Sequence, residues 1–222
     1  MTTVIAGFAP FPGAPFNPSG QLVEALQKAP PIDGVRSVVL PVAWEQSWTV
    51  LKSVIEEHRP RNVLLFGLHM KTERVRLELC ARNKRELGRE DRVGAFPSGP
   101  SILDGPERYD SHLPWAQIAA LLRQEGLDFE WSTNAGAYLC NDTLYRLAHH
   151  ARDYGIEHYG FIHVPVTDEM VEDLLKGPAD LPAVFNSISA AALFQFARVL
   201  GDWLSRTFPG TGPAVEDRVA SA

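Results

Sequence analysis

One cysteine and one histidine in this chain have the type and setting of a nucleophile and its base. Cys140 follows the small residues Asn134-Ala-Gly-Ala, where a predicted strand ends and a predicted helix begins. Unpaired N–H groups and the positive end of a helix dipole stabilise a thiolate in such a first turn. His163 follows the run Gly160-Phe-Ile, at the carboxyl end of a predicted central strand. Reactive groups gather at that edge of open α/β sheets, so His163 can take a thiol proton and later protonate a leaving amine.

Both residues also have ordinary structural interpretations. An arbitrary cysteine is more often buried and inert, and Cys80, inside an alternating strand, fits that description. A histidine taken alone is more often a hydrogen-bonded structural residue. By type alone, the carboxylate that orients the imidazole could be Glu73, Glu78 or Asp142.

Short β-rich runs alternate with amphipathic stretches along the chain, and this alternation predicts an α/β fold. Strands are predicted at 3–7, 35–42, 62–67, 73–79, 129–133 and 158–164, and helices at 20–28, from 44 onward, at 114–124, 138–152 and from about 188 to 206. Ser19 is the predicted N-cap of the first helix. The long segment 83–114 is mostly irregular, and a loop of this length is usually functional or mobile.

Length and composition favour one ordinary globular domain. The chain has 222 residues, 45% of them hydrophobic, and a net charge of −6. We expect a single domain over 1–208 and a flexible tail over 209–222. The acidic balance argues against binding to nucleic acid, and no apolar run is long enough for a membrane span.

The expected compartment is the cytoplasm, because the first residues lack the basic and apolar regions of a secretory signal. Two cysteines are too few for a disulfide framework and lack the spacing of a zinc site. No glycine-rich phosphate loop occurs. A metal hydrolase would need His69 and His112 to converge with a carboxylate, which nothing in their spacing suggests.

Five segments in this order resemble the pyroglutamyl-peptidase I family of cysteine peptidases: Phe8-Ala-Pro-Phe-Pro-Gly, Asn17-Pro-Ser, Glu73-Arg-Val, Asn134-Ala-Gly-Ala-Tyr-Leu-Cys-Asn and Gly160-Phe-Ile-His-Val-Pro. The cysteine and histidine segments are the specific ones. The resemblance implies one three-layer α/β/α domain with a mixed, mostly parallel sheet of the phosphorylase/hydrolase type. It also implies a homotetramer that removes an N-terminal pyroglutamyl residue from peptides without metal or cofactor.

The resemblance assigns roles to nine residues. Cys140 matches the nucleophile, His163 the base and Glu73 the carboxylate that orients the histidine. The remaining matches are to substrate-binding residues: Phe8 and Phe11 as the aromatic pair around the lactam ring, Leu68, Tyr138 and Leu139 around the pocket, and Arg82 as an arginine near the active site, one residue out of register.

The chain also departs from the family pattern. Counted to Glu73, the segment after Gly67 is shorter than usual, Leu68 replaces a glutamine and the proline before the glutamate is missing. These departures leave two alternatives to a pyroglutamyl peptidase: a cysteine amidase with another small acyl group as substrate, and a non-catalytic relative that binds a ligand. The presence of Cys140, His163 and Glu73 argues against the second.

Overall fold

A mixed, mostly parallel sheet of six strands forms the centre of the molecule. In this computed structural model, the described residues are 3–11, 16–176 and 185–208. The strand order is β2-β1-β3-β8-β4-β7, and β4 runs antiparallel to β8 while the other neighbouring pairs are parallel. The strands are β1 (Thr3–Phe8), β2 (Val35–Leu40), β3 (Asn62–Leu68), β4 (Val75–Glu78), β7 (Phe129–Ser132) and β8 (His158–Val164).

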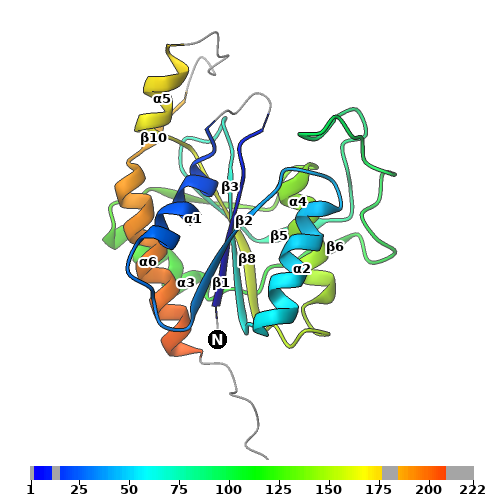
Figure 1. Ribbon diagram of the computed structural model, residues 1–222, viewed down its shortest axis with the longest axis horizontal. Coiled ribbons are helices and arrows are strands. Elements are labelled where there is room, and N and C mark those ends of the chain that lie inside the picture. Colours follow the sequence, from blue (N-terminus) through cyan, green and yellow to red (C-terminus); the bar gives the residue numbers. More distant parts are fainter. Residues whose placement is uncertain (1–2, 12–15, 177–184, 209–222) are drawn as a thin grey trace, which may run out of the picture.

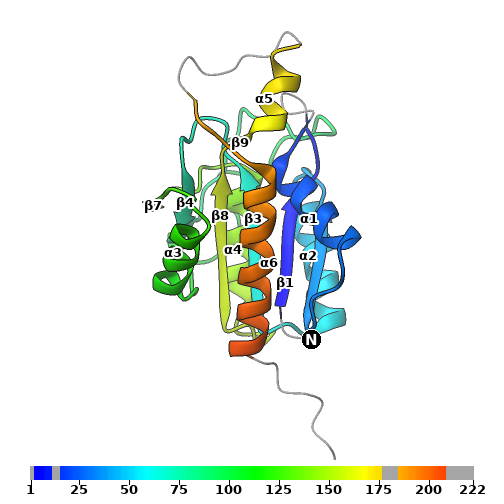
Figure 2. The same ribbon diagram turned by 90° about the vertical axis from the view of Figure 1, so that its left-hand side faces the viewer.

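Helices cover both faces of this sheet and make the three-layer α/β/α arrangement (Figures 1 and 2). One face carries α1 (Pro18–Lys28), α3 (Trp115–Gln124) and α6 (Ala190–Thr207), and the other carries α2 (Gln46–His58) and α4 (Leu139–His150). Each face has its own hydrophobic core, because successive side chains of a strand point to opposite sides. The predicted fold class is confirmed. The expected domain limits remain a prediction, and the tail lies outside the described residues.

Alternation along two strands decides which side chains reach the face with α2 and α4. On β8, the Phe161 side chain belongs to the core of that face, and the Ile162 side chain belongs to the opposite core. The His163 side chain therefore lies on the same face as Phe161. On β4, Arg76 pairs with His163 and Glu78 with Phe161. The antiparallel pairing of β4 with β8 therefore brings Arg76, Glu78 and His163 to one face.

Several local expectations differ from the structure. Asn17, rather than Ser19, caps α1, because the Asn17 side chain accepts a hydrogen bond from the Ser19 N–H. The Ser19 hydroxyl instead accepts from the backbone N–H of Phe8 at 3.0 Å. The predicted strand at 73–79 is shorter, and a separate strand follows it. Elements that the pattern did not predict are β5 (Cys80–Arg82), β6 (Arg108–Asp110), β9 (Val166–Thr167), α5 (Asp168–Leu174) and β10 (Ser187–Ile188).

The described helices include none that is long and apolar enough to cross a membrane.

Candidate active site

Cys140, His163 and Glu78 come together at the carboxyl edge of the parallel strands. Cys140 lies in the first turn of α4, as its position after the small-residue turn predicts. His163 lies near the end of β8 and lines the same cavity as Cys140, whose thiol raises the pKa of the imidazole. On its other side, His163 Nδ1 lies 2.8 Å from Glu78 Oε1. The three side chains form a thiol–imidazole–carboxylate chain.

Glu73 does not orient His163, and that prediction is wrong. Glu73 is exposed in the turn before β4, and its carbonyl oxygen accepts a hydrogen bond from Asn186. Glu78 lies five residues further along and has a fully buried side chain. Asp142, the third carboxylate of suitable type, pairs with Arg85 and Arg146 instead.

The electrostatics favour a charged pair around His163. Burial lowers the pKa of His163, but the charge on Cys140 and hydrogen bonds from Cys140 and Glu78 outweigh it and raise that pKa to about 9. For Glu78, burial acts to raise the pKa, and the hydrogen bond and charge of His163 lower it below its ordinary value. The imidazole is therefore held protonated beside a carboxylate at neutral pH.

Close approach of the backbone at Gly67 makes room for the thiol. A Cβ atom at Gly67 would lie 2.5 Å from Phe161 Cζ and 3.0 Å from Cys140 Sγ. Real Cβ atoms essentially never lie closer than 3.0 Å to another atom, so any side chain at position 67 would displace Phe161 and crowd the thiol. The end of β3 thus needs glycine in order to pass under Cys140.

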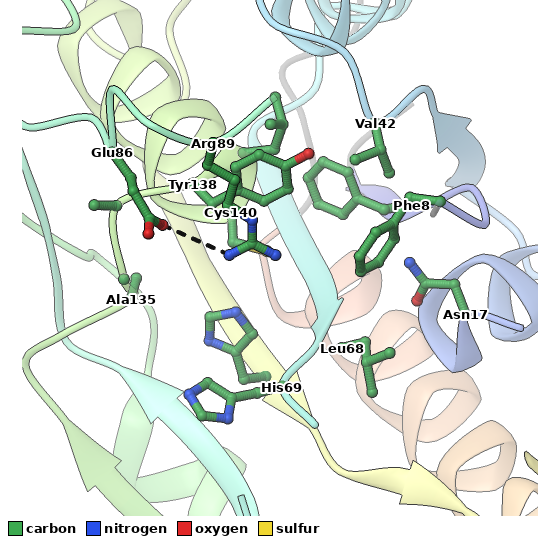
Figure 3. A pocket seen from close by; sticks show the side chains of 15 residues that line it. Phe8, Asn17, Val42, Leu68, His69, Glu86, Arg89, Ala135, Tyr138 and Cys140 are labelled. Carbon is green, nitrogen blue, oxygen red and sulfur yellow. Dashed lines mark ion pairs between the residues drawn. The ribbon is translucent and has the colours of Figure 1, made fainter. Parts of the chain in front are cut away.

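A cavity of about 210 Å³ opens at Cys140 and His163. Its two ends differ in character (Figure 3). Phe8, Val42 and Leu68 surround one end, whereas Glu86 and Ala135 lie on the other side of Cys140. The full lining is Phe8, Phe11, Asn17, Val42, Leu68, His69, Glu86, Arg89, Ala135, Gly136, Ala137, Tyr138, Leu139, Cys140 and His163. One end is thus mainly apolar and aromatic, with the Asn17 amide beside it, and the other carries the Glu86 carboxylate.

The apolar end rests on further packing. Phe11 and Leu68 pack against the buried residues Val166, Met170 and Leu174, which belong to β9 and α5. Asn17 fixes the entry to α1, because its side chain also donates to the carbonyl oxygen of Ala9 at 3.1 Å. The residues expected around the substrate, Phe8, Phe11, Leu68, Tyr138 and Leu139, are therefore brought together.

Comparison with known proteins assigns the family. The family model described as pyroglutamyl peptidase matches residues 1–193. The chain belongs to the pyroglutamyl peptidase family. The expected class of enzyme, a pyroglutamyl peptidase, is confirmed with it.

Relatives and solved structures of this family cover most of the chain. A pyrrolidone-carboxylate peptidase from Vibrio parahaemolyticus is 32% identical over 90% of this chain and 92% of its own length. One from Oceanobacillus iheyensis is 33% identical over 75% of this chain and 85% of its own. The crystal structure of pyroglutamyl peptidase I from Bacillus amyloliquefaciens superposes with a TM-score of 0.80 at 25% identity, covering 92% of this chain and 97% of that one. A pyrrolidone carboxyl peptidase from Fervidobacterium islandicum gives a TM-score of 0.82 at 25% identity, covering 93% and 99%.

Arg82 is not in the cavity of this pyroglutamyl peptidase family member. Its side chain reaches Glu107 at 3.8 Å, while its backbone N–H donates to the Asn141 side chain. The arginine that lines the cavity is Arg89, whose guanidinium lies 3.9 Å from the centre of the Tyr138 ring and pairs with Glu86 at 3.7 Å. Arg89 lies in the irregular segment 83–114, where no strand or helix pattern signals its direction.

The conclusion that the segment after Gly67 is short also depended on the assignment of Glu73, because the segment was counted to that residue. Counted to Glu78, the segment is five residues longer, so this argument for a changed substrate no longer holds. The replacement at Leu68 remains, with its side chain packed against the α5 cluster.

The other candidate groups have separate surroundings. Cys80 is buried, as predicted, and its thiol lies 3.3 Å from the Thr133 carbonyl oxygen. His69 lines the cavity with its ring centre 5.4 Å from that of His163, whereas His112 lies against Tyr159. Within the described ranges, no three His, Cys, Asp or Glu side chains cluster as metal ligands would.

Proposed function

We propose that Cys140 is the nucleophile, His163 the acid and base, and Glu78 the orienting carboxylate of a cysteine exopeptidase that hydrolyses the N-terminal pyroglutamyl amide bond of peptides. The observation that carries this proposal is the placement of Cys140 and His163 together in one small cavity, with His163 Nδ1 hydrogen-bonded to Glu78 on its other side. Membership of the family supports hydrolysis of pyroglutamyl peptides in general.

The size and apolar lining of the cavity suit a small ring. A volume of about 210 Å³ is below the range of roughly 300–1,000 Å³ that is typical of pockets for drug-sized ligands. Phe8 and Phe11 offer aromatic faces to a flat lactam. The scissile carbonyl then lies toward Cys140, and the leaving peptide lies toward Glu86, Arg89 and the turn 135–137.

The charges of the lining favour an acyl group without a free amine. Among the described residues that line the cavity, Glu86 is the one with a carboxylate, and it pairs with Arg89. Glu78 lies behind His163 and does not line the cavity. An N-terminal ammonium at the apolar end would therefore lack an acidic partner. A pyroglutamyl residue has a neutral lactam N–H in place of that ammonium.

The first half of the reaction forms an acyl-enzyme. The Cys140 thiolate adds to the pyroglutamyl carbonyl carbon, and negative charge develops on the carbonyl oxygen. Backbone N–H groups at the start of α4 are placed to stabilise it, since no side chain caps this end within the described structure. Protonated His163 gives its proton to the leaving nitrogen as the C–N bond breaks, which leaves a thioester on Cys140.

Water completes the cycle. Neutral His163 removes a proton from water, and the resulting hydroxide attacks the thioester carbonyl. The C–S bond then breaks, pyroglutamic acid leaves, and the thiolate–imidazolium pair is restored. Throughout, Glu78 accepts the Nδ1 hydrogen bond, which keeps the ring in the tautomer and orientation that both proton transfers need.

Release of a fluorogenic amine from its pyroglutamyl amide tests this function. We expect the wild-type protein to cleave that amide and to leave the matching prolyl and alanyl amides intact, and C140A to be inactive. An alkylating reagent should inactivate by modifying Cys140, while the buried Cys80, whose pKa burial raises, reacts slowly. Cleavage of another small acyl amide alone, or full activity of C140A, would contradict the proposal.

A further inference from the structure

Four charged side chains close a ring beside the nucleophile helix. The Asp142 carboxylate accepts from Arg85 Nε at 2.8 Å and from Arg146 Nε at 2.9 Å. The same two arginines donate through their terminal nitrogens to the Glu45 carboxylate, at 2.8 Å and 2.6 Å. Asp142, Arg85 and Arg146 are buried, while about half of the Glu45 side chain is exposed. Two cations thus balance two anions in a mostly buried setting.

Glu45 holds its place in this ring with a strained backbone. Its φ is +63° and its ψ −39°, and the Gln46 N–H donates to the Trp44 carbonyl oxygen at 2.7 Å. This is a γ-turn centred on Glu45, a rare and strained conformation for a residue with a side chain. Glu45 precedes α2, yet its carboxylate makes no cap hydrogen bond to that helix and turns to the two arginines instead.

The ring joins the three segments that build one wall of the cavity. Val42 lies three residues before Glu45, Glu86 follows Arg85 directly, and Tyr138 lies four residues before Asp142. Leu139, Cys140 and Arg89 come from the same segments.

Stacking contacts run between these segments as well. The Trp44 ring lies edge-on to the Tyr138 ring at 5.2 Å between centres, and the Arg85 guanidinium lies 5.6 Å from the centre of the Trp44 ring. The ring of charges therefore holds the three segments of this wall in fixed positions relative to one another.

We propose that Glu45 is a positioning residue for the substrate, which fixes this wall through Arg85 and Arg146. The proposal rests on the function proposed above. Without the Glu45 carboxylate, two buried guanidinium groups share the single charge of Asp142, so the segment that carries Arg85 separates from α2. Glu78 and His163 keep their hydrogen bond through the β4–β8 pairing, and Cys140 stays in the first turn of α4, so binding should suffer more than chemistry.

Two variants distinguish the effect of the Glu45 carboxylate from the effect of the strained Glu45 backbone. E45G relieves the left-handed backbone, which glycine adopts freely, but removes the carboxylate. E45Q keeps the shape and removes only the charge. The matched control is R59G, because Arg59 at the other end of α2 also has a positive φ, +46°, and takes no part in the ring.

We expect E45G and E45Q to raise KM for the pyroglutamyl amide about tenfold with kcat within about twofold, and R59G to leave both unchanged. Hydrogen exchange of the intact protein should become faster at 85–92 in both Glu45 variants and not in R59G. If E45G does not fold, E45Q alone decides.

Three results would overturn the proposal: wild-type KM and exchange in both Glu45 variants, a loss confined to kcat, or an equal rise of KM in R59G. If the wild-type protein does not cleave the pyroglutamyl amide, the proposed function fails separately. The exchange measurement then still decides whether Glu45 holds the wall.

Discussion

His163 carries the charge balance of the site. Its pKa is raised to about 9, so the protonated ring is favoured in the folded state over the unfolded one, where the ordinary value is 6.5. The stability that this pair contributes is fully present below about pH 6.5 and is lost as the pH rises through about 9. In the proposed mechanism the leaving amine takes this same proton, so stability and the first chemical step would depend on one titration.

Exchange of Glu78 for glutamine should change both the rate and its dependence on pH. E78Q removes a charge and a hydrogen bond that raise the pKa of His163, so the alkaline limb of kcat/KM should move to lower pH. We expect kcat/KM to fall at least about 100-fold, because the ring also loses its orientation. Steady-state assays between pH 5 and 10 measure both effects.

E73Q is the matched control for this change. Glu73 is exposed and has no contact with His163 through its side chain, so the variant should retain the wild-type profile within about twofold. A profile in E78Q that matches the wild type, or a loss in E73Q, would contradict the assignment of the orienting carboxylate.

At the scale of elements, the site depends on how closely strands and helix ends approach one another. β3 ends under the first turn of α4, and β4 lies beside β8 with its polar side chains turned toward His163. The turn 134–137 adds a positive φ of +85° at Gly136 and leads into α4. Small residues at these junctions matter because they set the distance between the backbone and the thiol.

Exchange of Gly67 for alanine tests this close approach. The added methyl would collide with Phe161 and Cys140 Sγ, so we expect G67A to lose about 1–3 kcal/mol of stability and most of its activity. Gly88 offers the control, since a Cβ there meets nothing within 4 Å. Thermal unfolding and amide hydrolysis should be affected in G67A and unchanged in G88A; full activity of G67A would contradict the packing argument.

For the whole molecule, the alternation of apolar runs was sufficient to predict the α/β class, because most of the predicted strands are largely buried. The three layers and the mixed sheet were expected from the family resemblance. The pattern also located Cys140 and His163, since both lie where one element ends and the next begins. It did not choose between Glu73 and Glu78, because strand pairing across 85 residues, and not local sequence, decides which carboxylate meets His163. Arg89 was missed for a related reason, since tertiary contacts alone place the segment that carries it.

The state of assembly is a separate prediction at this scale. We expect a homotetramer, as the family resemblance implies, with a mass four times the 24.5 kDa of one chain. Large apolar side chains on the described surface are consistent with further contacts: Leu87, Val93, Phe96, Trp131 and Leu175. Light scattering at micromolar concentration, repeated over a dilution series, measures the mass. A constant mass of one chain would contradict this expectation.

Because β4 must pair with β8 before the site is complete, the recovery of enzyme activity during refolding reports when this pairing forms. Glu78, Cys140 and His163 come from three separate stretches, and the hydrogen bond between Glu78 and His163 spans 85 positions. Closing a loop of that length is slow relative to forming a local helix. A refolding chain can therefore regain its helical signal early, whereas its peptidase activity should return only with the β4–β8 contact. Recovery of activity would then report on one strand-pairing step near the end of folding of the chain.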